Sequence, residues 1–303
     1  MMSVANEITR EEFEVLVFVE REKKIEKTIL SKYLEKLKID FKNVENLVAD
    51  NKLSVIDEIY GVTDKALEVL EKYRVKRAVI MAAGFGSRMV PITLNTPKPL
   101  VRVNGKRIID TIMEAVMEAE IEEVYLVRGY LWEQFDALLY KYPNIKFILN
   151  DKFNEANNIS SALLAKEYLS NAYVLEADLL INNPKIIRKY EYNTNYTGRY
   201  CEHTDDWCFK VEDGIIKELL VVGYDVYHMY GISYWTEDDG KKLAECIEKT
   251  FNMEDGKQKY WDEVSMRVFK DEFEINVRPC FEGDVIEIDT FDELTRIDEK
   301  YKI

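Results

Sequence analysis

The sequence predicts an α/β fold with a mostly parallel mixed sheet over residues 75–303, preceded by a small helical domain over residues 1–74. Three observations lead to this prediction. Residues 1–74 contain one glycine and no proline, and their apolar residues recur every three or four positions, as on one face of a helix. From residue 76 onward, apolar strands alternate with helical segments of about 10–15 residues, a pattern typical of parallel sheets with helices on both faces. The run at 77–83 is apolar almost throughout, as expected of a central strand that is buried on both sides.

The first part contains three short helices, an extended segment and a closing helix, predicted at 13–20, 29–37, 41–48, 53–56 and 63–72. This order resembles a winged helix-turn-helix of the MarR-like kind, which implies DNA binding through the third helix. Residues 40–51, however, carry one lysine and three acidic residues, whereas a recognition helix needs donors for phosphates and base edges. We therefore expect a docking or regulatory module that does not bind nucleic acid.

The second part alternates predicted strands at 77–83, 123–127, 145–149 and 172–175 with predicted helices at 108–120, 131–140 and 158–169. Beyond residue 197 the chain becomes richer in β-forming and aromatic residues, and it ends in an amphipathic helix predicted at 291–301. The sequence shows no internal repeat.

The 303 residues carry 42 basic and 57 acidic side chains, which give a net charge of −15. This balance fits a cytoplasmic enzyme and disfavours a protein that binds nucleic acid over a large surface. No apolar run approaches the ~20 residues of a membrane span, and the N-terminus lacks a basic start followed by an apolar stretch, so we expect neither a membrane span nor a signal peptide.

Because no cysteine pair has CxxC spacing, we expect reduced thiols. A zinc site is the alternative, although its spacing matches no familiar pattern; it would use Cys201, His203, Cys208 and His228.

The most informative segment is residues 82–100, AAGFGSRMVPITLNTPKPL, directly after a predicted buried strand. Gly84 and Gly86 permit a tight loop whose backbone N–H groups can approach phosphates. Arg88 offers a planar fork for a phosphate, and Lys98 lies between two prolines that stiffen its backbone. The segment is not a dinucleotide fingerprint, because Met89 stands where a third glycine is needed, and it lacks the Gly-Lys-Ser/Thr ending of a Walker loop.

Two aspartates follow apolar runs: Asp178 ends AYVLEAD and Asp289 ends VIEID. The carboxyl ends of parallel strands are the edge at which such sheets bind ligands, and carboxylate oxygens suit Mg²⁺, which proteins usually bind through carboxylates and substrate phosphates. The alternative is that both aspartates only terminate strands. With the glycine loop present, we expect them to bind the metal ion.

Aromatic residues of the second half raise the question of a cationic substrate. Trp207 lies in the polar segment EHTDDWC, and Tyr260 follows a polar stretch. Core packing explains most aromatic residues. A quaternary ammonium group, however, is held by aromatic faces and a nearby carboxylate, because it has no N–H to donate.

The pattern AAGxGxRxxPxT followed by PKxL resembles the signature of Rossmann-like nucleotidyltransferases, which join a nucleoside monophosphate to a small phosphorylated compound. Residues 77–303 are similar to bacterial CTP:phosphocholine cytidylyltransferases, in the loop and in the segments 129–136, 149–158, 204–207, 231–235, 259–264 and 286–289. The resemblance implies catalytic roles for Arg88 and Lys98, and Mg²⁺ on Asp178 and Asp289. It implies a choline site of Trp207, Tyr260 and Glu287. Nucleotide contacts are implied at Ala83, Gly84, Phe85, Gly86, Ser87, Asn158 and Ser160.

The sequence thus predicts a Mg²⁺-dependent enzyme that converts CTP and phosphocholine to CDP-choline and pyrophosphate. Two alternatives stay open. One is the same chemistry on another phospho-alcohol or on a sugar 1-phosphate, and the other is a winged-helix transcriptional regulator with a ligand-sensing transferase-like domain. The sequence does not predict an oligomeric state.

Overall fold

The computed structural model describes residues 8–302. The chain divides into two compact units. The N-terminal unit comprises the chain as far as Arg74 together with Tyr190–Tyr192, and the α/β unit comprises Val75–Lys189 and the chain from Asn193 onward. The three residues at 190–192 were not expected in the first unit.

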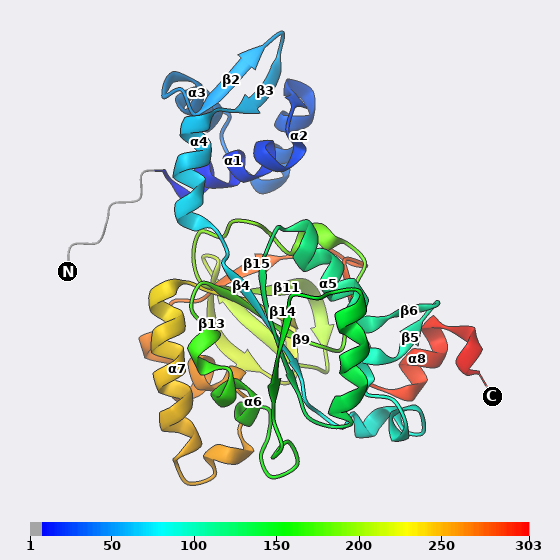
Figure 1. Ribbon diagram of the computed structural model, residues 1–303. Helices are drawn as coiled ribbons and strands as arrows, with labels where there is room; N and C mark the ends of the chain where they lie inside the picture. Colours follow the sequence, from blue (N-terminus) through cyan, green and yellow to red (C-terminus); the bar gives the residue numbers. More distant parts are fainter. Residues whose placement is uncertain (1–7, 303) are drawn as a thin grey trace. The chain divides into compact units, whose positions relative to one another are not determined.

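From residue 8 onward, the N-terminal unit contains four α-helices, labelled α1 to α4 in Figure 1, and a small three-stranded sheet in the order β1-β3-β2. Its elements are α1 (Arg10–Glu22), β1 (Ile25–Glu26), α2 (Lys27–Leu37), α3 (Lys42–Ala49), β2 (Leu53–Ile56), β3 (Ile59–Val62) and α4 (Asp64–Leu70). Thr9 begins α1 with a capping box, and Thr63 caps α4 as its hydroxyl suggests. The winged-helix interpretation of this unit stays a prediction.

The segment Tyr190–Tyr192 completes the core of the N-terminal unit. Tyr190 is fully buried in that core, and the Tyr192 ring packs 5.3 Å from both Phe13 and Tyr73, centroid to centroid. The Tyr192 hydroxyl also donates to the carbonyl of Ile8 at 3.1 Å. A short piece of chain from the middle of the sequence is therefore part of this core.

The α/β unit is built on a nine-stranded sheet in the order β11-β15-β13-β12-β14-β9-β4-β7-β8. Strands β4, β7, β8 and β9 form a parallel block, whereas β14 joins β9 antiparallel and most pairings beyond it are antiparallel. The sheet is therefore mixed rather than mostly parallel, because hairpins from the second half extend it. The strands are β4 (Arg77–Ala82), β7 (Glu123–Arg128), β8 (Ile145–Leu149), β9 (Ala172–Glu176), β11 (Asn195–Thr204), β12 (Cys208–Glu212), β13 (Ile215–Leu220), β14 (Gly223–Trp235) and β15 (Asn276–Pro279).

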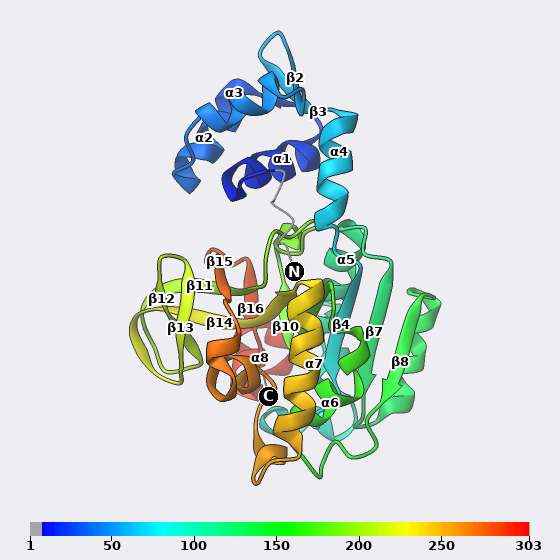
Figure 2. The same cartoon turned by 90° about the vertical axis from the view of Figure 1, so that its left-hand side faces the viewer.

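Helices cover both faces of this sheet, with α5 on one face and α6 and α7 on the other (Figures 1 and 2). Alternate residues of β4 show the division: Ala78 and Ile80 pack into the core with α5, and Val79 and Met81 pack into the core with α6 and α7. The helices are α5 (Ile108–Glu118), α6 (Ile159–Leu164), α7 (Glu237–Phe251) and α8 (Phe291–Ile297).

A separate two-stranded sheet pairs β10 (Leu179–Ile181) antiparallel with β16 (Val285–Glu287). Another small pair joins β5 (Arg102–Val103) to β6 (Lys106–Arg107). No helix among residues 8–302 combines the length and apolar character needed to cross a bilayer.

Three predicted helices differ from the sequence expectation. The helix predicted at 131–140 is a 3-10 run, Trp132–Tyr140, which follows Leu131 in the left-handed conformation. The helix predicted at 158–169 ends at Leu164 and is followed by a 3-10 turn at Lys166–Tyr168. The last helix, predicted at 291–301, ends at Ile297. Asp298 has an extended backbone, and its carboxylate accepts hydrogen bonds from the backbone N–H groups of Asn104 and Lys300.

Candidate active site

The glycine loop leaves the end of β4 and returns to bring Lys98 beside it. Gly86 has a φ of 68°, in the left-handed region, and its carbonyl accepts a hydrogen bond from the Thr93 hydroxyl at 2.9 Å. A Cβ on Gly86 would lie 3.1 Å from the Cβ of Lys98 and 3.2 Å from the Cγ2 of Thr93. Glycine therefore serves both the backbone conformation and the close approach of the lysine.

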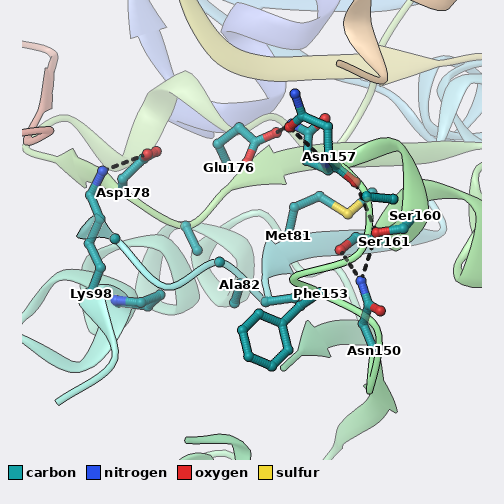
Figure 3. A pocket seen from close by; sticks show the side chains of 17 residues that line it. Met81, Ala82, Lys98, Asn150, Phe153, Asn157, Ser160, Ser161, Glu176 and Asp178 are labelled. Atoms are coloured by element: carbon teal, nitrogen blue, oxygen red, sulfur yellow. Dashed lines mark hydrogen bonds and ion pairs between the residues drawn. The ribbon is translucent and has the colours of Figure 1, made fainter. Parts of the chain in front are cut away.

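A cavity of about 240 Å³ opens beside this loop, between the ends of β4 and β9 and the start of α6. Lys98 and Asp178 lie at one side of it, and Asn150, Ser160 and Ser161 lie at the other (Figure 3). Its lining includes five of the residues predicted to contact the nucleotide: Ala83, Gly84, Gly86, Asn158 and Ser160. Phe85 and Ser87 belong to the loop but are not among the described residues that line the cavity.

Asn150 and Glu176 line this cavity too, and sequence reasoning missed both. The Asn150 side-chain amide donates to the hydroxyls of Ser160 and Ser161, at 3.0 Å each, and so fixes the start of α6. The Glu176 carboxylate accepts from the Trp261 indole at 2.9 Å and from the Asn158 amide at 3.3 Å. Burial raises the pKa of Glu176 well above its usual value. The sequence feature that could have suggested Glu176 as a site residue is its position two residues before Asp178.

Asp178 and Asp289 converge because β10 and β16 pair antiparallel, with Leu179 opposite Glu287. The N–H of Ile288 donates to the carbonyl of Asp178 at 3.2 Å, which holds the two aspartates next to each other. The sequence predicted this convergence through two strand ends at one sheet edge. The structure achieves it with the separate two-stranded sheet.

Lys98 lies between these aspartates. Its ammonium nitrogen is 2.9 Å from Asp178 Oδ2 and 2.8 Å from Asp289 Oδ1, and Arg88 Nη2 lies 2.9 Å from the same Asp289 oxygen. Burial works against the charged form of Lys98, but the two carboxylates more than offset it and raise the pKa of Lys98 above its ordinary value. Lys98 is therefore a fixed positive charge at the edge of the cavity.

The carboxylates of Asp178, Glu287 and Asp289 can bring one oxygen each within 4.8 Å of one another. The second side-chain oxygen of Asp178 is buried and makes no hydrogen bond to any residue that the structure describes. Three carboxylates with an unsatisfied oxygen fit a hard divalent cation such as Mg²⁺. The sequence predicted Asp178 and Asp289 for this cluster but not Glu287, although its spacing of two from Asp289 in an extended segment would put both side chains on one side.

The predicted choline residues divide between two places. The rings of Trp207 and Tyr260 meet at 5.5 Å with an interplanar angle of 66°, and Tyr260 is 44% exposed. Glu287 lies with the acidic cluster, where burial and the charges of Asp178, Asp289 and Asp206 raise its pKa well above the usual value.

The cysteines show no sign of the alternative zinc site. All four are free thiols, and Cys201, His203, Cys208 and His228 form no cluster of three metal-ligating side chains within residues 8–302.

Comparisons with known proteins agree with this geometry. Residues 77–197 match the family described as "Nucleotidyl transferase". A 2-aminoethylphosphonate cytidylyltransferase of Lancefieldella rimae is 36% identical over 228 residues, which cover 74% of this chain and 92% of that protein. The chain belongs to the nucleotidyltransferase family. A choline-phosphate cytidylyltransferase of Streptococcus pneumoniae is 32% identical over 229 residues, 75% of this chain and 98% of that protein.

Solved structures of the family share the fold of the α/β unit. The CTP:phosphocholine cytidylyltransferase of Streptococcus pneumoniae matches with a TM-score of 0.69 and 31% identity, over 76% of this chain and 100% of that chain. The inositol-1-phosphate CTP transferase from T. maritima matches with a TM-score of 0.59 and 17% identity, over 74% of this chain and 96% of that chain. The second likeness concerns the fold alone.

Proposed function

We propose that the α/β unit transfers a cytidylyl group from CTP to phosphocholine, with release of pyrophosphate. The observation that carries this proposal is the Trp207–Tyr260 ring pair, because the residue after Tyr260, Trp261, donates hydrogen bonds to Asn158 and Glu176 of the cavity lining. Two aromatic rings on a polar, partly open surface suit a trimethylammonium group, and the carboxylate of Asp206, which accepts the backbone N–H of Trp207, suits its charge. The nearby cavity offers the room for a nucleotide.

In this proposal the acceptor phosphate oxygen attacks the α-phosphorus of CTP, a new P–O bond forms, and the bond to pyrophosphate breaks. No general base is needed, because the attacking oxygen is already an anion at neutral pH. Asp178 and Asp289, with Glu287 as third carboxylate, would hold Mg²⁺, which when bound supplies a Lewis acid for phosphate oxygens. Lys98 and Arg88 orient the phosphates and stabilise the charge that builds up during attack.

Sequence similarity favours a second acceptor, 2-aminoethylphosphonate. The relative from Lancefieldella rimae that carries this name is 36% identical, and the choline-phosphate relative from Streptococcus pneumoniae is 32% identical. The two acceptors differ where the aromatic pair would touch them. A primary ammonium keeps three N–H donors that must find acceptors, whereas a trimethylammonium group needs only apolar faces and a charge.

The test is a pyrophosphate-release assay with CTP and each acceptor in turn, on wild type and on Trp207→Ala. An aromatic face is worth about 0.5–2 kcal/mol, so the substitution should raise KM for phosphocholine roughly two- to thirtyfold and leave KM for CTP nearly unchanged. Trp132→Ala is the matched control, because Trp132 also carries an arginine over its ring, 4.9 Å from Arg128, but begins the 3-10 run Trp132–Tyr140, which contains none of the predicted site residues. Preference for 2-aminoethylphosphonate by wild type would replace phosphocholine with the second acceptor.

For the N-terminal unit we propose a docking or regulatory role of the winged-helix type without DNA binding. Its third helix, α3, offers one basic side chain, Lys42, against Glu45 and the following Asp50. A gel-shift assay on genomic fragments tests this, and a specific, salt-sensitive complex would contradict it.

A further inference from the structure

The two rings of the aromatic pair come from segments far apart in the sequence, and one ion pair reaches both of them. Glu263 and Arg267 lie four residues apart, with Arg267 Nη1 2.7 Å from Glu263 Oε1. Glu263 lies in the resembling segment 259–264 but was given no role there, and Arg267 lies outside that segment. We call this pair the Glu263–Arg267 clip.

The glutamate end of the clip holds Tyr260. Its other oxygen, Oε2, accepts the backbone N–H of Tyr260 at 2.9 Å, and the N–H of Glu263 donates to the carbonyl of Tyr260 at 3.1 Å. These two bonds close the turn that starts at Tyr260. The Glu263 side chain is only 12% exposed, whereas Tyr260 is 44% exposed. The position of the Tyr260 ring is therefore set by the hydrogen bonds of this turn rather than by core packing.

The arginine end of the clip holds Trp207. The guanidinium carbon of Arg267 lies 4.8 Å from the centroid of the Trp207 ring, within range of a cation–π contact. Its Nη2 donates to the carbonyl of Leu219 at 3.2 Å. Leu219 is on β13 and pairs with Phe209 of β12, the strand that begins just after Trp207. Arg267 therefore ties the turn at Tyr260 to the hairpin that carries the tryptophan.

We propose that the Glu263–Arg267 clip sets the spacing of Trp207 and Tyr260 and thereby the affinity for the acceptor's cationic group. This inference rests on the proposed acceptor site. Both clip residues are positioning residues, since they act through the two rings. Glu263 contacts the Tyr260 segment, Arg267 contacts the Trp207 ring, and the ion pair joins these two contacts.

The test compares Arg267→Gln, Arg267→Lys and Glu263→Gln in steady-state kinetics. Loss of the guanidinium or of the charge pairing should raise KM for phosphocholine about two- to tenfold, the range of one cation–π contact or exposed ion pair, and change kcat and KM for CTP less than twofold. Arg267→Lys should recover part of the loss, because it keeps the charge without the planar fork. The double substitution Glu263→Gln with Arg267→Gln should be no worse than the poorer single variant, since both disrupt one unit.

The matched control is Glu237→Gln, which disrupts a pair with the same spacing on α7, Lys241 Nζ to Glu237 Oε1 at 2.7 Å. It should leave all three constants unchanged. A fall in kcat or a rise in KM for CTP as large as that for phosphocholine would overturn the positioning role.

A second measurement follows the geometry without any substrate. Acrylamide quenching of tryptophan fluorescence should increase in Arg267→Gln relative to wild type, and this increase should vanish when Trp207→Phe is also present. If Trp207→Ala raises KM for phosphocholine but Arg267→Gln changes neither KM nor quenching, the clip is overturned and the proposed function stands. If Trp207→Ala leaves KM unchanged, the proposed acceptor site fails, and the clip loses its role in acceptor binding whatever the quenching shows.

Discussion

Substitution of Lys98 by methionine separates the electrostatic role of this residue from its packing. Methionine keeps most of the side-chain length and removes the ammonium that bridges Asp178 and Asp289 at 2.9 and 2.8 Å. The Lys98 side chain is 11% exposed, so water replaces little of the lost charge. The variant would be left with three carboxylates whose oxygens lie within 4.8 Å of one another.

The size of the effect follows from this burial. Removing one partner of a buried ion pair costs about 3–5 kcal/mol, and Asp178 is still 23% exposed, which favours the lower end. A loss of about 3 kcal/mol corresponds to a melting temperature lower by roughly 6–12 °C for a unit of this size. Because Mg²⁺ can supply the missing positive charge, its addition should stabilise Lys98→Met more than wild type. The lost transition-state contact should lower kcat about 10²- to 10³-fold.

The assay is a thermal melt in EDTA and in Mg²⁺, combined with pyrophosphate release at saturating CTP. Lys241→Met is the control, because Lys241 belongs to an exposed ion pair and should change neither quantity. Equal melting of Lys98→Met and wild type in EDTA would refute the electrostatic reasoning. A higher KM for CTP with an unchanged kcat would make Lys98 a binding residue only.

Three further outcomes are expected. Asp178→Ala should abolish pyrophosphate release while the variant still melts cooperatively, and near-normal turnover at saturating Mg²⁺ would remove Asp178 from the metal site. Burial raises the pKa of Asp262 to about 7, although the hydrogen bond that the Tyr196 hydroxyl donates to Asp262 acts in the opposite direction. Between the pKa of the unfolded chain and about 7, the folded protein therefore keeps a proton on Asp262 that the unfolded chain loses. Wild-type stability should therefore fall as pH rises from 5 to 8, and urea unfolding should show a smaller fall for Asp262→Asn; equal slopes would contradict this sign. A chain that starts at Val75 should keep cytidylyltransferase activity but melt at a lower temperature, because it exposes the rings at 190–192. A folded, inactive product would show that the two units share the catalytic function.

The sequence could predict the parts of the site whose chemistry depends on local pattern. The glycine loop, Lys98 and the strand-end position of Asp178 are all visible as short motifs, and the structure brings Lys98, Asp178 and Asp289 together. Asn150 could not be predicted, because its contacts to the serines of α6 exist only once β8 and α6 are adjacent. Glu287 was assigned to the cationic group from resemblance, whereas the pairing of β10 with β16 puts its carboxylate among the metal-binding candidates.

Strand direction was the main error in the fold. The alternation of strands and helices ends near residue 176, and the hairpins that follow have no sequence feature that fixes which edge of the sheet they join. They join the sheet where β14 pairs with β9, so the parallel block makes up four of the nine strands of a mixed sheet.

The Tyr190–Tyr192 segment has a consequence for how such a chain can arise and be rearranged. A module fused in front of an enzyme is usually joined by one linker, and a single recombination point can exchange it. Here the polypeptide passes between the two units three times, after Arg74, after Lys189 and after Tyr192. Recombination after Arg74 alone would replace the N-terminal module but keep Tyr190–Tyr192, whose rings pack into the core of the original module. The two parts of this gene therefore have to change as a pair, and a new N-terminal module would need matching substitutions more than a hundred residues downstream.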